Sequence, residues 1–188
     1  LCCRRATAFP PAASSEALTF FRDASQLYFR IHGAGGDLRK KALLEKNIAL
    51  ALLNTGSLTE SIDHFDAALS HLGVWVPRSK VAAGAWFVFN LLALFSQLYL
   101  RIGLRRRVRD WDVEREFFEI CFNRGRAEIT SNPTRLFFDT VAAFRHFNEI
   151  DATKIDQASA IYVSAAAVFA YSGISFAVTR RAIEYAKQ

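Results

Sequence analysis

The segment from Lys41 to Gly73 constrains the fold more than any other, because it carries the signals of two helices joined by one tight turn. Apolar residues recur at intervals of three and four on both sides of Gly56, as on the buried face of an amphipathic helix. Gly56 and Gly73 each follow such a run, and glycine tolerates the left-handed backbone that ends many helices. Ser57 and Glu60 have the spacing of a capping box, which predicts the start of the second helix. A single hairpin of this length cannot bury its own apolar face, so we expect it to pack on similar neighbours.

The hairpin also has small residues placed around an aromatic one. Ala49 lies in the first predicted helix, and Ser61 and Ala68 flank Phe65 in the second. With Gly56 at the turn, this pattern resembles one tetratricopeptide (TPR) repeat, a helix–turn–helix unit of about 34 residues. The positions that depart from the family pattern are Glu45 and Leu52, which replace aromatic residues, and Gly73, which replaces the closing proline. The resemblance implies that Phe65 and Ala68 are buried where the two helices cross.

The rest of the chain also predicts helices. It has only four prolines, few alternating runs of strand-forming residues, and much alanine and leucine. Helix starts are predicted at Asp37, Asp110 and Asn132, the last of which precedes a proline that suits a first helical turn. We therefore expect an all-α protein of about eight helices, arranged as an α-solenoid of about four stacked TPR-like hairpins over residues 14–188. Residues 1–13 are expected to form a linker, because two consecutive prolines disfavour a helix there.

Proteins of the TPR family use their repeats to bind other proteins, and the first helix of each pair lines the inner face of the curved stack. Carried over to this chain, the resemblance implies a partner-binding surface made by Lys46, Leu50, Leu53 and Asn54. The order of the predicted helices is similar to the TPR region of large bacterial signalling proteins that carry an ATPase domain and sometimes a nucleotide-cyclase domain. The resemblance thus implies a scaffold module for signal transduction, without catalysis of its own, whose partner is a peptide or a neighbouring protein domain.

We expect the chain to be a fragment of a longer protein, since it has no methionine and begins at Leu1. Its three cysteines, Cys2, Cys3 and Cys121, have neither the even number of a disulfide framework nor the spacing of a metal site. They fit the reducing cytoplasm, which is the location that we expect. Two arginines follow Cys2 and Cys3, so these cysteines also fit a palmitoylation site.

Residues 81–100 contain no charged side chain, and two interpretations of this segment stay open. About 20 apolar residues are enough to cross a bilayer, which favours a membrane-associated protein anchored through residues 81–109. The other interpretation is a helix buried in the solenoid over most of its circumference, and it is the one that we expect. Asn90 and Gln97 are seven residues apart, share one helix face, and would then lie near its rim. The side chains expected to be inaccessible to water in that case are Trp86, Phe89 and Leu92.

Positive charge gathers directly after this apolar segment. The net charge of the chain is +6, and one short stretch holds five arginines: Arg101, Arg105, Arg106, Arg107 and Arg109. Since these five account for most of the net charge, the basicity is local and does not indicate a general nucleic-acid-binding protein. Cations after a helix C-terminus are favoured by the helix dipole, so the cluster fits a solvated loop. It also fits contact with anionic lipid or with an acidic partner.

No pattern of catalytic or metal-binding residues is found in the sequence. His64 and His71 are seven residues apart on one predicted helix, and the nearby aspartates do not complete a known metal-ligand spacing. The glycines between Gly33 and Gly36 follow no predicted strand and lack the lysine of a phosphate-binding loop. His146 has no partner at a recognisable spacing. We therefore expect no metal, no cofactor and no enzyme activity.

Overall fold

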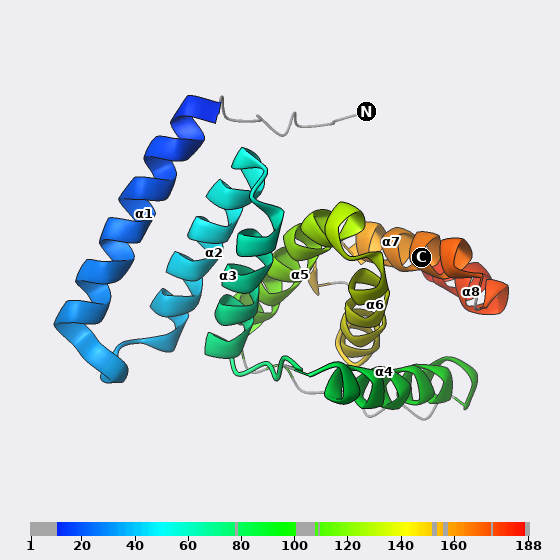
Figure 1. The fold of residues 1–188 in the computed structure, drawn as a ribbon. Helices are drawn as coiled ribbons and strands as arrows, with labels where there is room; N and C mark the ends of the chain where they lie inside the picture. The colour runs from blue at the N-terminus through cyan, green and yellow to red at the C-terminus, as the bar shows by residue number, and fades with distance from the viewer. Residues whose placement is uncertain are drawn as a thin grey trace. The chain divides into compact units, whose positions relative to one another are not determined.

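The computed structural model describes residues 11–77, 79–100, 108, 110–151, 154–155, 158–173 and 175–186. Over these residues the chain forms helices and no strands (Figure 1), so the all-α class is confirmed. The α-helices are α1 (Pro11–His32), α2 (Leu38–Thr55), α3 (Leu58–His71), α4 (Lys80–Phe95), α5 (Trp111–Ser131), α6 (Pro133–Asn148), α7 (Ala158–Ser172) and α8 (Phe176–Ala186). A 3-10 turn, Gly33–Gly35, follows α1, and a π-helical segment, Ser96–Leu100, continues α4.

The chain divides into two compact units. The first contains residues 1–76 and 122–131, and the second contains residues 77–121 and 132–188. The boundary passes through α5, whose first half belongs to the second unit and whose second half belongs to the first. Each unit has its own apolar core. Large side chains that are fully buried are Leu52, Phe65 and Leu69 in the first unit and Leu94, Ile120, Val141, Phe144, Phe147 and Phe169 in the second.

Helix α1 begins earlier than the sequence predicts. Its first residue is Pro11, so the expectation that residues 11–13 belong to a linker is wrong. Proline suits the first position of a helix because the backbone N–H that it lacks would have no partner there. α1 packs against α2 in the first unit, and Tyr28 accepts a hydrogen bond from the backbone N–H of Asp37 at 2.9 Å. Asp37 caps α2 as predicted, since its side chain accepts the backbone N–H of Arg39 at 2.9 Å.

The turn between α2 and α3 is formed as the sequence predicts. Gly56 has a φ of 85°, and its backbone N–H donates to the carbonyl of Leu53 at 3.2 Å. The backbone N–H of Ser57 donates to the carbonyl of Leu52 at 3.0 Å. These two bonds form a Schellman motif, which satisfies carbonyl groups that the end of a helix leaves free. The end of α3 is marked in the same way by Gly73, which has a φ of 81°.

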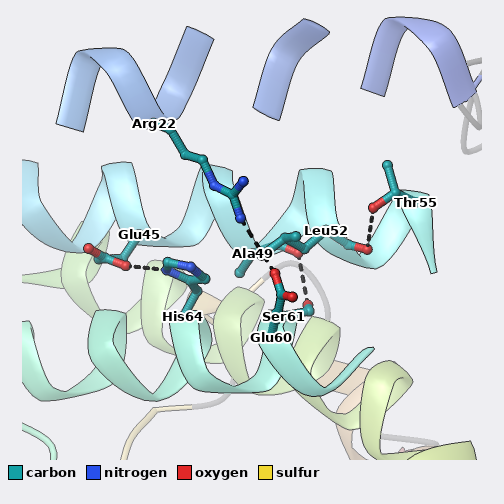
Figure 2. Close-up of polar contacts among 8 residues, drawn as sticks. All are labelled: Arg22, Glu45, Ala49, Leu52, Thr55, Glu60, Ser61 and His64. Carbon is teal, nitrogen blue, oxygen red and sulfur yellow. Dashed lines mark hydrogen bonds and ion pairs between the residues drawn. The ribbon is translucent and has the colours of Figure 1, made fainter. Parts of the chain in front are cut away.

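Helices α2 and α3 cross on small side chains. Ala49 and Ser61 are fully buried, and the Ser61 hydroxyl donates a hydrogen bond to the backbone carbonyl of Ala49 at 2.8 Å (Figure 2). Phe65 and Ala68, which follow along α3, are also 0% exposed. The prediction that Phe65 and Ala68 are buried within the hairpin is therefore confirmed.

The predicted capping box at the start of α3 is wrong. The side chain of Ser57 caps no backbone N–H, because Ser57 also completes the end of α2. Its backbone angles, φ −79° and ψ 67°, therefore depart from the extended conformation of a capping residue. Glu60 instead pairs with Arg22 of α1 at 3.4 Å (Figure 2). Both side chains are exposed, so this pair contributes little to stability although it bridges α1 and α3.

In the second unit, α5 and α6 each start at the cap that the sequence predicts. The Asp110 side chain accepts a hydrogen bond from the backbone N–H of Asp112 at 2.9 Å, at the start of α5. The Asn132 side chain accepts one from the backbone N–H of Arg135 at 3.1 Å, and Pro133 takes the first position of α6. Both caps satisfy backbone donors that a helix start leaves free.

Helix α4 packs against α6, and two contacts between them indicate their relative direction. In the N-terminal part of both helices, the ring of Phe87 stacks on that of Phe138, with the ring centroids 4.4 Å apart. Near their C-terminal ends, the Gln97 side chain donates a hydrogen bond to Glu149 at 3.2 Å. Residue numbers increase in both helices from the first pair to the second, so α4 and α6 run in the same general direction.

Two antiparallel helix pairs complete the second unit. Phe118 of α5 contacts Phe147 of α6, with ring centroids 5.2 Å apart. Phe118 precedes the connection between the two helices by about as many residues as Phe147 follows it, so α5 and α6 run antiparallel. Helices α7 and α8 are joined at Gly173, which has a φ of 68°. Both of these last helices bury small residues, which permits close packing. These are Ala165, Ala166 and Ala182.

Candidate interaction surfaces

The surface predicted for partner binding lies on α2, which packs against both α1 and α3 (Figure 1). Leu50 and Leu53 are half-buried, and Asn54 is exposed. Lys46 is only 8% exposed. The prediction that Lys46 belongs to an accessible surface is therefore wrong, because packing on two neighbouring helices leaves α2 little free surface. The part of the predicted surface that a partner can reach consists of Leu50, Leu53 and Asn54.

The arginine cluster lies outside the described residues. This holds for Arg101, Arg105, Arg106, Arg107 and Arg109. Their contact with anionic lipid or with an acidic partner therefore stays a prediction. In the sequence the first of them directly follows Leu100, the last residue of the π-helical segment.

One side of α4 and of its π-helical continuation carries a row of exposed apolar side chains, which we call the outer stripe. Its members are Val81, Ala85, Val88, Phe89, Leu92, Tyr99 and Leu100. Among the described residues, the segment Lys80–Leu100 is the one helix long and apolar enough to cross a membrane. Contiguous exposed apolar side chains are typical of contact sites on proteins, so the outer stripe is a candidate interaction surface.

The outer stripe contradicts the prediction that this helix is buried over most of its circumference. Phe89 and Leu92 are predicted to be inaccessible, yet they are 54% and 65% exposed. Asn90 is predicted to lie near the rim, whereas it is fully buried. The physical reason is that α4 packs along α6, which covers only one of its sides. The buried residues of the segment are Asn90, Leu94 and Leu98.

The covered side of the segment holds its amide side chains. Nδ2 of Asn90 donates a hydrogen bond to the carbonyl of Trp86, one turn earlier in α4, at 2.7 Å. Gln97 donates to the carboxylate of Glu149 at 3.2 Å, and Arg145 donates to the same carboxylate at 2.8 Å. The segment thus turns its amides toward protein and many of its apolar side chains outward. This is the reverse of the usual amphipathic helix on a protein surrounded by water.

A cleft of about 560 Å³ lies where α4 and α6 begin. Trp86 and Phe138 form its apolar walls, and Lys80 and Arg135 contribute positive charge. Arg135 is paired with Asp139, another lining residue, at 3.4 Å. The volume suits a small molecule, but a cation that is compensated within the protein attracts an anion only weakly. We therefore assign no ligand to this cleft.

Two histidines are hydrogen-bonded to glutamates. Nδ1 of His64 lies 2.6 Å from Oε2 of Glu45 (Figure 2), and Nε2 of His146 lies 2.8 Å from Oε2 of Glu114. The sequence indicates no partner for His146 at a recognisable spacing, but the fold supplies one from the preceding helix. The ring of His146 also packs against that of Phe117, with centroids 4.7 Å apart. In the described part of the chain, no three His, Cys, Asp or Glu side chains are placed to hold a metal ion.

A buried ionic cluster that the sequence analysis missed joins α3 to the second half of α5 in the first unit. Nε of Arg124 lies 3.1 Å from Oδ1 of Asp66 and 3.0 Å from Oε1 of Glu128. The side chains of Arg124 and Glu128 are 6% and 1% exposed. The spacing of Arg124 and Glu128 by four residues is visible in the sequence, but only the fold brings Asp66 to them. The cluster thus links α3 to α5 through paired charges that are largely withdrawn from water.

Comparison of the chain with known protein families, known proteins and solved structures finds no match. The TPR resemblance therefore rests on the residues of the α2–α3 hairpin and on the order of the predicted helices.

Proposed function

We propose that the chain is a helical-repeat interaction module of a larger signalling protein. In this proposal it is a TPR-like α-solenoid that holds a peptide or a neighbouring protein domain and has no catalysis of its own. The observation that carries the proposal is the crossing of α2 and α3, where Ala49, Ser61 and Ala68 are all 0% exposed. Small residues at the crossing are the feature by which this hairpin resembles a TPR unit, and such units occur where repeats stack on one another.

The order of helices in the second unit supports the same proposal. In a stack of hairpins, successive helices run antiparallel, so alternate helices run parallel and lie side by side. Helices α4 and α6 are related in this way, from the stacked rings of Phe87 and Phe138 to the bond between Gln97 and Glu149. Helices α7 and α8 add a further hairpin.

The partner surface that we propose on α2 consists of Leu50, Leu53 and Asn54. Half-buried leucines beside an exposed amide offer an apolar contact together with a hydrogen-bonding group, as protein interfaces commonly do. In this proposal the module works in the cytoplasm, and its partner is another protein segment.

Affinity purification with the immobilised chain tests this surface. The doubly substituted chain Leu53→Glu/Asn54→Arg should recover about tenfold less of a specific partner than the unchanged chain, since it places two charges on the proposed contact. Ile129→Glu is the control, because Ile129 lies on α5 and is 60% exposed. If the doubly substituted chain recovered as much of the partner as the Ile129→Glu control and the unchanged chain, the partner would bind elsewhere.

A second function, association with a membrane through residues 81–109, is favoured by one observation. The outer stripe of α4 is exposed and faces away from α6, and five arginines follow it in the sequence. An apolar surface next to cations suits a bilayer that presents anionic headgroups. Fractionation without detergent tests this function. The chain should sediment with membranes, whereas a chain that stays entirely in the soluble fraction would exclude it.

A further inference from the structure

We infer that α4 binds the surface of a bilayer that contains anionic phospholipid and lies in the plane of that bilayer. The outer stripe then enters the region between the headgroups and the upper acyl chains. This inference rests on the second proposed function, membrane association, and adds to it the orientation of the helix and the class of lipid. It differs from a transmembrane crossing, which the length of Lys80–Leu100 equally permits.

The packing of α4 on α6 opposes a crossing. The two helices stay together from the stacked rings of Phe87 and Phe138 to the hydrogen bond between Gln97 and Glu149. Over this length and just beyond its ends, α6 brings charged residues with it, namely Arg135, Asp139, Arg145 and Glu149. A crossing would draw these charges toward the hydrocarbon, where ionised side chains are strongly disfavoured. A helix in the membrane plane keeps α6 on the water side while its own outer stripe enters the lipid.

Cations lie beside the outer stripe, and no acidic residue lies within it. The guanidinium of Arg181 is 4.6 Å from the centre of the Tyr99 ring. Arg145 also lies beside the stripe, 5.7 Å from the centre of the Phe89 ring, but its charge is compensated by Glu149 at 2.8 Å. Lys80 is exposed at the start of α4. Aromatic rings and cations are enriched together at the membrane–water interface, where the cations face lipid phosphates. This charge complementarity favours an anionic bilayer over an uncharged apolar partner.

Sedimentation of the whole chain with lipid vesicles tests the lipid class and the outer stripe. Vesicles of phosphatidylcholine mixed with phosphatidylserine should bind the chain about tenfold more tightly than vesicles of phosphatidylcholine alone, because the cations gain anionic partners. Leu92→Asp should weaken binding by about tenfold, since it withdraws one apolar side chain and adds a charge. Ile31→Asp is the matched control and should leave binding unchanged, because Ile31, on α1, is 65% exposed like Leu92.

Depth measurements separate the in-plane position from a crossing. Val81, Val88 and Leu100 are replaced by cysteine one at a time, in a chain whose native cysteines are serine, and each cysteine receives a fluorescent label. Quenching by brominated lipids then reports the depth of each label. We expect one shallow depth for all three, about 5–10 Å into the interface. A deep label at Val88, with Val81 and Leu100 at opposite surfaces, would overturn the in-plane position and leave membrane association intact.

Three other results would contradict the membrane contact itself, and not only the orientation of the helix. No binding to either kind of vesicle would remove the membrane function together with this inference. Binding that Leu92→Asp leaves unchanged would exclude the outer stripe as the contact. Self-association in solution that Leu92→Asp abolishes, without vesicle binding, would assign the stripe to a second copy of the chain.

Discussion

The hydroxyl of Ser61 donates a hydrogen bond to the backbone carbonyl of Ala49 at 2.8 Å where α2 and α3 cross, and both residues are fully buried. The short serine side chain reaches the backbone of the other helix because alanine leaves room for the approach. Further along α3, Ala68 is buried to the same degree. The close packing of this hairpin therefore depends on residue size at these three positions.

The first prediction concerns Ala68→Arg. This variant should lose about 3–5 kcal/mol of unfolding free energy, because it forces a long, charged side chain into a contact that is 0% exposed. Urea denaturation followed by circular dichroism measures the loss. Ser70→Arg on the same helix is the control, since Ser70 is exposed, and it should change stability by less than about 0.5 kcal/mol. A near-normal midpoint for Ala68→Arg would remove the repeat-like assignment of the hairpin.

The second prediction contrasts two glycines. Gly56→Ala should cost about 1–2 kcal/mol, because Gly56 has a φ of 85° and a Cβ is disfavoured in that conformation. Nothing lies within 4 Å of a Cβ added at either Gly56 or Gly84, so crowding plays no part. Gly84→Ala, inside α4, should stabilise the chain by about 0.5–1 kcal/mol, since alanine is the better helix former. Thermal denaturation of both variants should therefore give melting-temperature shifts of opposite sign. A Gly56→Ala variant that melts no lower than the unchanged chain would contradict the helix end at Gly56.

The third prediction concerns the buried ionic cluster. Arg124→Ala should destabilise the first unit by about 3–5 kcal/mol, because it removes the cation from beside a carboxylate, Glu128, that is 1% exposed. Arg126→Ala is the matched control two residues away. The Arg126 side chain is exposed and, among the contacts described, bonds only to Asn123, at 3.2 Å. Its loss should therefore cost less than about 0.5 kcal/mol. Denaturant titration compares the two variants. Equal effects would show that the cluster contributes nothing beyond an exposed pair.

Local features of the fold could be predicted because the residues that determine them lie within one helical turn. Asp37 and Asn132 cap their helices, and Gly56 ends α2, as their types and neighbours indicate. The capping box at Ser57 was the local exception. One residue there serves two helix ends at once, and the end of α2 sets its backbone.

Features that depend on which helices meet could not be predicted in the same way. A segment without charges suits both a buried helix and a membrane surface. The sequence of residues 81–100 therefore did not predict that α4 is covered along only one side. Two other features could not be predicted for the same reason, namely the pairing of His146 with Glu114 and the burial of Lys46. Each follows from the placement of a neighbouring helix, for which the sequence holds no short-range signal.

The last prediction tests which side of α4 is buried, using one residue type at two nearby positions. Leu94 is 0% exposed and Leu92 is 65% exposed. Leu94→Ala should cost about 2–5 kcal/mol of unfolding free energy, because it removes buried methyl groups and leaves a cavity. Leu92→Ala should cost less than about 0.5 kcal/mol, since its side chain is mostly in contact with solvent. The change in helix propensity is the same in both variants, so the difference reports burial alone. Urea denaturation in the absence of lipid gives both values. Equal losses would mean that protein covers the outer stripe, and the basis for membrane contact through α4 would then be lost.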